Sequence, residues 1–390
     1  MDSERKFAVT RRQFVTSSTA AVVAGALLPD GLAREQPPAQ ERPASSSPSR
    51  VIIDTDPGVD DAFALLLAMR SPELKIEGIT AVAGNVPLEL TLPNALRMVE
   101  IAGRTDIPVA GGARGPLTRR LVTAAYVHGE NGLGGAEFPE PKTKPVSEPA
   151  PEFIRTTVRK HPGEITLITI GPLTNVAMAL NMDPDLRGMI PKLVMMGGSL
   201  SGGNITPAAE FNIYVDPEAA RVVFQSGIPI TMVGLDVTRK TGLTDAHVRR
   251  LESAQNPVSQ AAANIAHHAI QHYREAGFLV DPNMHDSLAV AAFLNPSLLK
   301  WKEYYVDVET EGELTAGETL GYSSAGDPPR SADAAKKAAA TMTIRGSAPT
   351  LATTKTSPVL RDHFVPNTNV AMEVDSAGFF ELLIGRLTGK

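Results

Sequence analysis

Residues 51–69 have the sequence V-I-I-D-T-D-P-G-V-D-D-A-F-A-L-L-L-A-M, which predicts a strand, a turn and a helix in succession. The short apolar, β-branched run 51–53 is typical of a buried strand, and the Pro-Gly pair after the second aspartate is typical of a turn. The almost wholly apolar run 62–69 predicts a buried helix. We therefore expect the rest of the chain to be organised around a strand–turn–helix unit.

Four carboxylates lie within eight positions of this unit, at Asp54, Asp56, Asp60 and Asp61. Ionised side by side, they repel one another, and a cation removes that repulsion. Ligation by carboxylate oxygens suits a hard ion such as Ca²⁺ or Mg²⁺. A simpler interpretation is that one aspartate caps the helix and the others are solvated. A cap needs only one side chain, so the cluster favours a metal site.

Beyond this unit, short β-branched runs alternate with helical patterns, which predicts an α/β fold with a mostly parallel open sheet flanked by helices. The carboxyl ends of parallel strands face one crevice, so we expect the site there, near the turns at 84–85, 171–175 and 197–199. The predicted strands are 51–53, 76–82, 107–110, 165–170, 193–196, 230–235 and 304–308, and the later predicted helices are 92–102, 153–160, 217–226, 245–254, 257–276 and 287–294.

The composition narrows the class of ligand. The chain has 390 residues, 43% of them hydrophobic, and a formal net charge of −6. A nucleic-acid partner is not expected, because binding phosphates needs a concentrated basic surface. A small polar ligand fits better. The chain has no cysteine, which excludes a thiolate nucleophile and a cysteine-ligated zinc site.

The amino terminus resembles an export signal of the twin-arginine (Tat) type. The motif T-R-R-Q-F-V at 10–15 precedes a weakly apolar stretch and the small-x-small sequence G-L-A at 31–33. We predict a signal at 1–33, a Pro/Ser-rich linker at 34–50, and one α/β domain at 51–390 with a flexible insertion around 323–357; whether cleavage occurs at Ala33 does not follow from the sequence. The mature protein would be periplasmic or extracellular, without stable membrane association.

The order of motifs along the chain resembles that of the nucleoside hydrolases, which cleave the N-glycosidic bond of ribonucleosides with a tightly held Ca²⁺. The resemblance covers about residues 50 to 320. It implies a Rossmann-like fold, a ribonucleoside substrate and a dimer or tetramer. The motifs are D-T-D-P-G-V-D-D at 54–61, A-V-A-G-N at 81–85, H-G-E-N-G-L-G-G at 128–135, G-P-L-T-N-V-A-M-A at 171–179, V-M-M-G-G at 194–198, G-N-I-T at 203–206, A-E-F-N-I at 209–213, D-P-E-A-A at 216–220 and M-H-D-S-L-A-V at 284–290.

Transferred to this chain, the resemblance implies that Asp56, Asp61, Asp286 and the main-chain carbonyl of Ile170 bind the ion. Asp56 would also be the general base that takes a proton from water, since a cation lowers the pKa of water that it binds. Asp54 would support these ligands from behind.

The resemblance assigns the substrate contacts as well. Asp60, Asn85 and Asn212 would bind the ribose near its 2′- and 3′-hydroxyls, and Asn204 and Glu210 its 5′-hydroxyl. His285 would be the leaving-group acid, because histidine titrates in the useful range. His128, in a glycine-rich loop, is a second candidate on the side of the base.

Other residues have simpler interpretations. His267, His268 and His272 are expected on a solvated helix face, because no acidic residue completes a zincin-like motif. Tyr273 is equally consistent with a base pocket and with an ordinary partly buried position, and Trp301 is expected in the core. Turn or capping roles account for Asp236 and Thr238.

Two other functions are consistent with parts of the pattern. One is an aspartate-dependent phosphohydrolase, because D-x-D after a first strand occurs in that class as well. The other is an exported nucleoside-binding protein without turnover, although a pure binder needs neither the base Asp56 nor the acid His285. The base preference, purine or pyrimidine, does not follow from the sequence.

Overall fold

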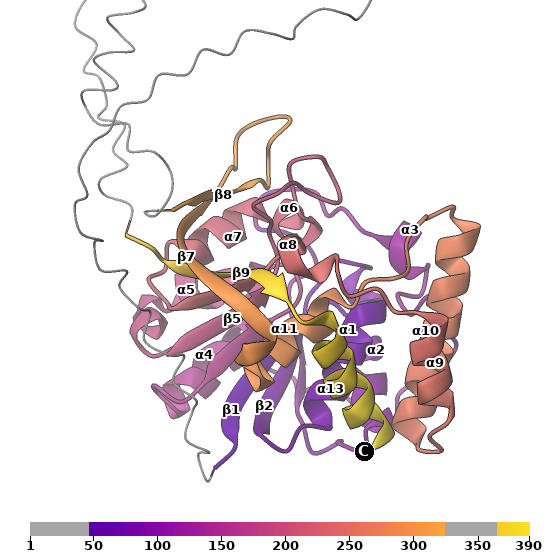
Figure 1. The fold of residues 1–390 in the computed structure, drawn as a ribbon. Helices are drawn as coiled ribbons and strands as arrows, with labels where there is room; N and C mark the ends of the chain where they lie inside the picture. The colour runs from indigo at the N-terminus through magenta and orange to yellow at the C-terminus, as the bar shows by residue number, and fades with distance from the viewer. Residues whose placement is uncertain (1–46, 324–364) are drawn as a thin grey trace, which may run out of the picture. The chain divides into compact units, whose positions relative to one another are not determined.

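The central sheet has the strand order β3-β2-β1-β4-β5-β6-β9-β7-β8 in the computed structural model, which describes residues 47–323 and 365–390 (Figure 1). All neighbouring strands from β3 to β9 are parallel, and β7 and β8 add an antiparallel edge. The strands are β1 (Ser49–Thr55), β2 (Leu74–Ala81), β3 (Val109–Gly111), β4 (Thr166–Thr169), β5 (Lys192–Met196), β6 (Ile230–Val233), β7 (Leu299–Val308), β8 (Thr319–Tyr322) and β9 (Thr368–Val374).

The strand order reverses next to β1, which pairs with β2 on one side and with β4 on the other. Chain connections leave the sheet in opposite directions at such a point, so a crevice opens at the carboxyl ends of the two strands. Asp54 lies in β1, Asp56 follows β1 directly, and Ile170 follows β4 directly. The topology therefore brings the predicted ligands of both strands to one place.

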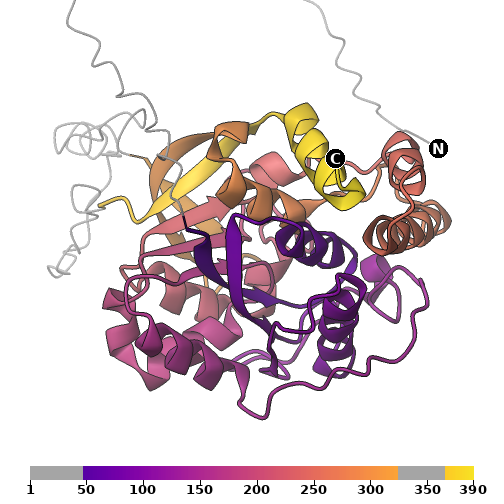
Figure 2. The ribbon, with the colours of Figure 1, turned by 90° about the horizontal axis from the view of Figure 1, so that it is seen from below.

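Helices cover both faces of the sheet, and successive residues of the strands pack into two different cores (Figure 2). In β1, Val51 and Ile53 join the core beneath α1, whereas Ile52 joins the core beneath α4. The first core receives α1 (Val59–Met69), α2 (Leu88–Ile101), α9 (Asp245–Glu252), α10 (Pro257–Glu275), α11 (His285–Leu294) and α13 (Ser376–Thr388), and the second receives α4 (Ala150–Lys160), α5 (Thr174–Met182) and α7 (Pro217–Phe224).

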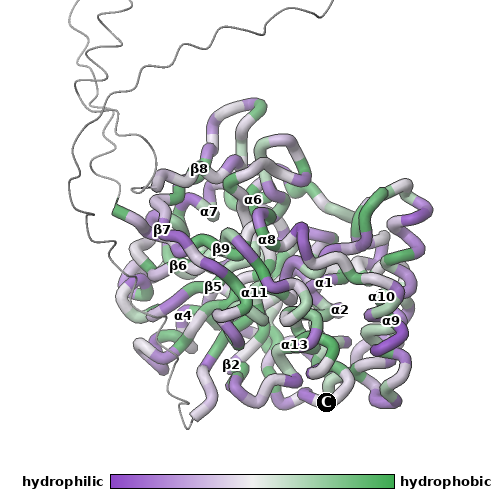
Figure 3. Tube along the Cα trace, viewed as in Figure 1, coloured by the Kyte–Doolittle hydropathy of each residue, from purple (hydrophilic) through white to green (hydrophobic). Residues whose placement is uncertain are grey.

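Helix α1 is buried along its whole length, because it lies between the sheet and the outer helices. The outer helix α9 is much more hydrophilic (Figure 3). The remaining short helices are α3 (Ala125–His128), α6 (Phe211–Val215), α8 (Leu235–Thr238), and the 3₁₀ turns η1 (Pro184–Gly188) and η2 (Pro296–Leu298). Three of them, α3, α6 and α8, lie around the carboxyl edge of the sheet, where they position side chains of the site (Figure 1).

The predicted fold class is confirmed, but several boundaries were wrong. The predicted strand 230–235 ends at Val233, because Gly234 approaches Gly198 closely and α8 begins at Leu235. The last predicted strand begins at Leu299 rather than at 304, since its first half pairs with β9. Helix α11 begins two residues before the predicted 287. The prediction lacked β8, β9, α5 and α13.

The predicted signal 1–33, most of the linker 34–50 and almost all of the insertion 323–357 lie outside the described residues, so they stay predictions. Within 47–323 and 365–390, no helix has both the length and the apolar character needed to cross a bilayer.

Candidate active site

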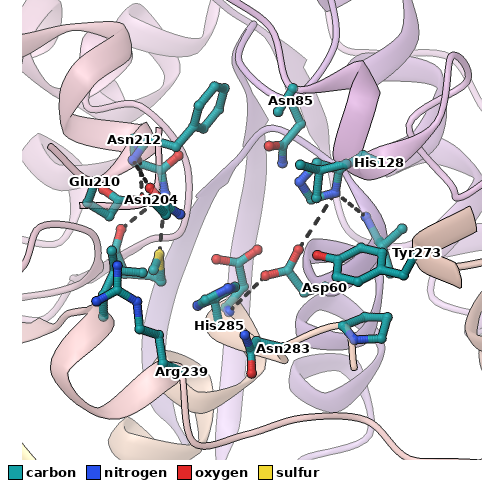
Figure 4. A pocket seen from close by; sticks show the side chains of 18 of the residues that line it. Asp60, Asn85, His128, Asn204, Glu210, Asn212, Arg239, Tyr273, Asn283 and His285 are labelled. Carbon is teal, nitrogen blue, oxygen red and sulfur yellow. Dashed lines mark hydrogen bonds and ion pairs between the residues drawn. The ribbon is translucent and has the colours of Figure 1, made fainter. Parts of the chain in front are cut away.

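A cavity opens at the carboxyl edge of the sheet, and most of the predicted site residues line it (Figure 4). Asp54, Asp56 and Asp61 are not among the lining residues; all three are buried. Those that line it are Asp60, Asn85, His128, Ile170, Asn204, Glu210, Asn212, His285 and Asp286.

The turn between β1 and α1 is held in place by Asp61. Its carboxylate accepts hydrogen bonds from the Thr55 hydroxyl at 2.6 Å, the Gly58 main-chain N–H at 2.9 Å and the Asn85 amide at 2.9 Å. A side chain at Gly58 would collide with the His128 ring and the Asn85 amide. The Pro-Gly turn therefore serves close packing as well as a change of direction.

Asp56 is fully buried, and only one of its carboxylate oxygens has a hydrogen-bond partner among the described residues. The Asn85 main-chain N–H donates to Oδ2 at 2.7 Å, whereas Oδ1 has no partner. Glycines at 84 and 171 pack against this carboxylate, and a Cβ at either position would collide with it. The glycine turns after β2 and β4 thus make room for Asp56.

Three buried carboxylates, those of Asp60, Asp61 and Asp286, present oxygen atoms that all lie within 4.8 Å of one another. The first two begin α1 and the third begins α11, and these helices pack together. Burial raises the pKa of Asp60 to about 7 and, together with the Asp60 charge, raises the pKa of Asp286 well above its usual range. The pKa values of Asp56 and Asp61 are raised as well, chiefly by burial.

A hard divalent cation fits this set of ligands. All the candidate donors are oxygens, the carboxylates are buried without a cationic side chain among their partners, and Asp56 Oδ1 lacks any partner in the described chain. The compact group contains Asp60, which the resemblance assigned to ribose. The carbonyl of Ile170 lines the cavity and accepts a long hydrogen bond of 3.4 Å from the Asn212 amide.

Asp54, in β1 two residues before Asp56, is buried. The Thr80 hydroxyl and the Asn175 amide donate to its Oδ1, the latter at 2.8 Å, while its Oδ2 has no partner among the described residues. Asn175 also binds the Ala81 carbonyl and the Ala113 main-chain N–H. This amide therefore connects β1, β2 and the residues after β3. Sequence reasoning noted its motif but did not assign it a role. Burial raises the pKa of Asp54 to about 7.

The opposite wall comes from the segment that leads into α6. Glu210 caps this helix, and its carboxylate accepts main-chain hydrogen bonds from Gly198 at 2.9 Å and Asn212 at 3.0 Å. Asn204 uses its side-chain oxygen to accept the Phe211 N–H at 2.9 Å, which leaves its amide nitrogen for a ligand. Burial raises the pKa of Glu210 to about 7.

Two histidines face the cavity, and each has a defined partner at Nδ1. The Val59 N–H, in the first turn of α1, donates to Nδ1 of His128 at 3.1 Å, so the neutral ring carries its proton on Nε2. The Thr238 hydroxyl lies 2.7 Å from Nδ1 of His285. Burial lowers the pKa of His128 to about 3 and that of His285 to about 4, so both rings are neutral near pH 7.

Sequence reasoning missed the apolar and aromatic part of the cavity. Tyr126, Phe278 and Val280 line it and are exposed, and the Tyr273 ring packs at a tilt of 32° against Phe278, with 4.5 Å between ring centroids. These residues belong to no motif, so only the fold brings them together. Tyr273, for which two interpretations were open, is a cavity residue.

The structure agrees with some of the structural roles predicted for residues outside the site and differs from others. His267 and His268 are exposed on α10, as predicted, whereas His272 is only partly exposed and its Nε2 lies 2.8 Å from the Tyr126 carbonyl. Trp301 packs at the edge of the core. Asp236 and Thr238 do not end a strand; they lie in α8, where Asp236 accepts the Leu200 N–H.

Comparisons with known proteins agree with this architecture. Residues 51–381 match the family described as inosine-uridine preferring nucleoside hydrolase. The pyrimidine-specific ribonucleoside hydrolases RihA of Salmonella agona and Salmonella typhimurium are each 47% identical over 272 residues, which is 69% of this chain and 87% of the relative.

Solved structures give the same result. The plant nucleoside hydrolase PpNRh1 superposes with a TM-score of 0.74 and 32% identity, covering 88% of this chain and 100% of the other. The purine-preferring ribonucleoside hydrolase of Gardnerella vaginalis gives 0.72 and 32%, covering 87% and 98%. The chain therefore belongs to the inosine-uridine preferring nucleoside hydrolase family and is a hydrolase that acts on N-glycosyl compounds.

Proposed function

We propose that this protein uses Ca²⁺ to hydrolyse the N-glycosidic bond of ribonucleosides, giving ribose and a free base. The observation that carries the proposal is the group of three carboxylates within 4.8 Å, which begins two packed helices beside a cavity lined by asparagines and histidines. A ribosyl group presents several hydroxyls, which a cation and neighbouring asparagine side chains can bind together. A phosphohydrolase would instead need several cationic side chains around a phosphate, and Arg239 is the one lysine or arginine among the described residues that line this cavity.

The proposed ion ligands are Asp56, Asp61, Asp286 and the carbonyl of Ile170, with an oxygen of Asp60 close by. Carboxylates and a carbonyl without nitrogen or sulfur favour Ca²⁺ over zinc. When bound, the ion would supply positive charge that offsets the carboxylates, lowers the pKa of nearby water and binds vicinal hydroxyls.

Asp56 is the proposed general base. Its Oδ2 is fixed by the Asn85 N–H, which orients the carboxylate, and its buried Oδ1 has no hydrogen-bond partner in the described chain. An oxygen without a partner is available to take a proton from water as the water attacks the anomeric carbon. The sugar then passes through an oxocarbenium-like state, as in glycoside hydrolysis generally.

The ribose contacts are proposed on both walls. Asp60 and Asn85 lie beside the ion ligands and face the 2′- and 3′-hydroxyls together with Asn212. Asn204 and Glu210, on the segment before α6, face the 5′-hydroxyl. Because main-chain N–H groups fix Glu210 and the side-chain oxygen of Asn204, both residues are preorganised for the substrate.

Departure of the base is assigned to His285, with His128 as a second donor. Since burial lowers the pKa of His285 to about 4, its ring is neutral near pH 7. It therefore acts by an N–H hydrogen bond to the negative charge that develops on the base as the glycosidic bond breaks. Tyr273 and the exposed Tyr126 and Phe278 offer flat apolar surfaces for the base. Because the relatives that are 47% identical are pyrimidine-specific, we propose pyrimidine ribonucleosides as the preferred substrates.

We also propose export by the Tat route to the periplasm or the exterior, supported by the twin-arginine motif at 10–15 and the sequence that follows it. Exchange of both Arg11 and Arg12 for lysine should keep the full-length protein inside the cell, as measured by fractionation. Arg5→Lys is the control, because it leaves the motif intact. Export of the double variant at the normal level would contradict this proposal.

The protein with Ca²⁺ should release ribose from uridine, and Asp56→Asn should lower kcat by at least about 10²-fold, the usual contribution of a general base. The amide keeps the shape of the side chain but cannot take the proton. Ribose release and uridine binding are both measured, and Asp245→Asn, at an exposed carboxylate paired with Arg274, is the control. Uridine bound without any ribose release by the unaltered protein would indicate a binding protein and refute the hydrolase.

His285→Ala should slow uridine hydrolysis by about 10²-fold or more, yet change the rate on a 4-nitrophenyl riboside little, because nitrophenolate leaves without assistance. His268→Ala is the matched control, since that imidazole is exposed on α10 and, within the described residues, hydrogen-bonds only the Asn264 carbonyl. Equal losses on the two substrates would show that His285 does not assist the leaving group.

Without Ca²⁺, the protein should become less stable as the pH rises from about 4 to about 7, where Asp54, Asp60 and Glu210 titrate when folded. A carboxyl with a raised pKa binds more protons in the folded protein than in the unfolded chain, so stability falls through this window. The lowered pKa values of His128 and His285 act in the opposite direction, but the buried carboxyls with raised pKa values are more numerous, since Asp56, Asp61 and Asp286 add to the three named above. Ca²⁺ should reverse the trend, because it binds the ionised carboxylates.

Melting temperatures in EDTA and in Ca²⁺ measure this effect. In EDTA, Asp60→Asn should raise the melting temperature more at about pH 8 than at about pH 5, whereas the exposed Asp245→Asn should not. A Ca²⁺-induced gain that does not grow with pH would argue against carboxylate ligation.

A further inference from the structure

The ring of His285 has one hydrogen-bond partner among the described residues, the Thr238 hydroxyl, 2.7 Å from Nδ1. Thr238 is fully buried at the end of α8, and His285 begins α11 beside the cavity. Sequence reasoning gave this threonine only a turn or capping role. Its side chain instead reaches across to the residue proposed to assist the leaving base.

The two residues are held in register by a short antiparallel pairing of the main chain. The Met284 N–H donates to the Thr241 carbonyl at 2.9 Å, the Leu243 N–H donates to the Pro282 carbonyl at 2.8 Å, and Gly242 pairs with Asn283. The start of α11 is therefore fixed against the segment that follows α8. This pairing brings the side chains of Thr238 and His285 within reach of each other.

Thr238 is itself fixed on its main-chain side. Its N–H donates to the Gly234 carbonyl at 3.1 Å, and its carbonyl accepts the Thr241 hydroxyl at 2.7 Å and the Thr241 N–H at 3.1 Å. Its own hydroxyl does not return to the preceding turn of the helix, which is the common alternative for threonine. The hydroxyl is left to the His285 ring.

The direction of this hydrogen bond follows from the chemistry of a buried hydroxyl. An O–H that is removed from water needs an acceptor, and Nδ1 is the one acceptor that the described chain offers to Thr238. If the hydroxyl donates to Nδ1, a neutral ring carries its proton on Nε2. In the opposite tautomer Nε2 would have a lone pair and could not donate to a departing base.

We propose that Thr238 is a positioning residue for leaving-group departure, whose hydroxyl donates to Nδ1 of His285 and thereby presents Nε2–H to the base. This inference rests on the proposed role of His285. When the glycosidic bond breaks, its electron pair moves onto the base, and the Nε2–H hydrogen bond stabilises that charge. Thr238 does not touch the substrate and acts only through the ring.

The test compares Thr238→Val, which keeps the shape but removes the hydroxyl, with Thr238→Ser, which keeps the hydroxyl. For uridine, the valine variant should lose about 10- to 100-fold in kcat, as residues that orient a functional side chain usually do, and the serine variant should recover most of it. The 4-nitrophenyl riboside should be hydrolysed by both variants at nearly the normal rate. Thr231→Val, the same exchange at a buried threonine of β6, is the matched control.

A second measurement gives a result on the unaltered protein alone, before any variant is made. The ¹⁵N–¹H correlations of the imidazole in the unaltered protein should show His285 protonated at Nε2, and in Thr238→Val the tautomers should become mixed. Protonation at Nδ1 in the unaltered protein would overturn the inference, and so would a normal kcat of Thr238→Val on uridine. If His285→Ala affects both substrates equally, the proposed role of His285 fails first. If it affects uridine selectively while Thr238→Val does not, only the present inference fails.

Discussion

Mutual repulsion of buried carboxylates at the junction of α1 and α11 is the constraint on which the rest of this structure depends. Asp60, Asp61 and Asp286 converge from two helices, and Asp56 approaches from the end of β1. Each carboxylate is expensive to bury in its charged form, which is why their pKa values are raised. The N-termini of α1 and α11 and nearby main-chain N–H groups offset part of the free-energy cost of burying these charges. A bound cation would offset most of the rest.

The sheet and the helices can be understood as the support that this arrangement requires. The reversal of strand order at β1 opens a crevice without any break in the core, and packing of α1 against α11 brings residues more than two hundred positions apart into contact. Outside the carboxylates, amides and hydroxyls such as those of Asn175, Thr80 and Thr55 fix the carboxylate oxygens. Hydrogen bonds therefore hold the acidic part of the site, whereas the apolar side chains of the cavity, Tyr126, Phe278 and Val280, are exposed.

The fold class and most polar residues of the cavity were predictable, because they follow from motifs and their order along the chain, whereas Arg239 and Asn283, which also line the cavity, lie outside the predicted site residues. The roles of Thr238 and Asn175 were not predictable, since their partners lie 47 and 121 residues away and depend on tertiary packing. Strand β9, which pairs with β6 and β7, was not predicted either. Nor were the apolar residues that line the cavity, because they belong to no motif. Export, the choice of Ca²⁺ and the oligomeric state stay predictions.

The glycines around the acidic group have a consequence for protein engineering. Gly58, Gly84 and Gly171 leave no room for a Cβ against the Asp56 carboxylate, the Asn85 amide or the His128 ring. Transplanting only the aspartates onto another α/β scaffold would therefore not reproduce the centre, because the recipient turns would have to be glycine at the same three places. Positions such as Phe278 and Val280 have no such restriction. Variant libraries that test the proposed base contacts should therefore vary these exposed apolar positions. They should keep the aspartates and the three glycine turns unchanged.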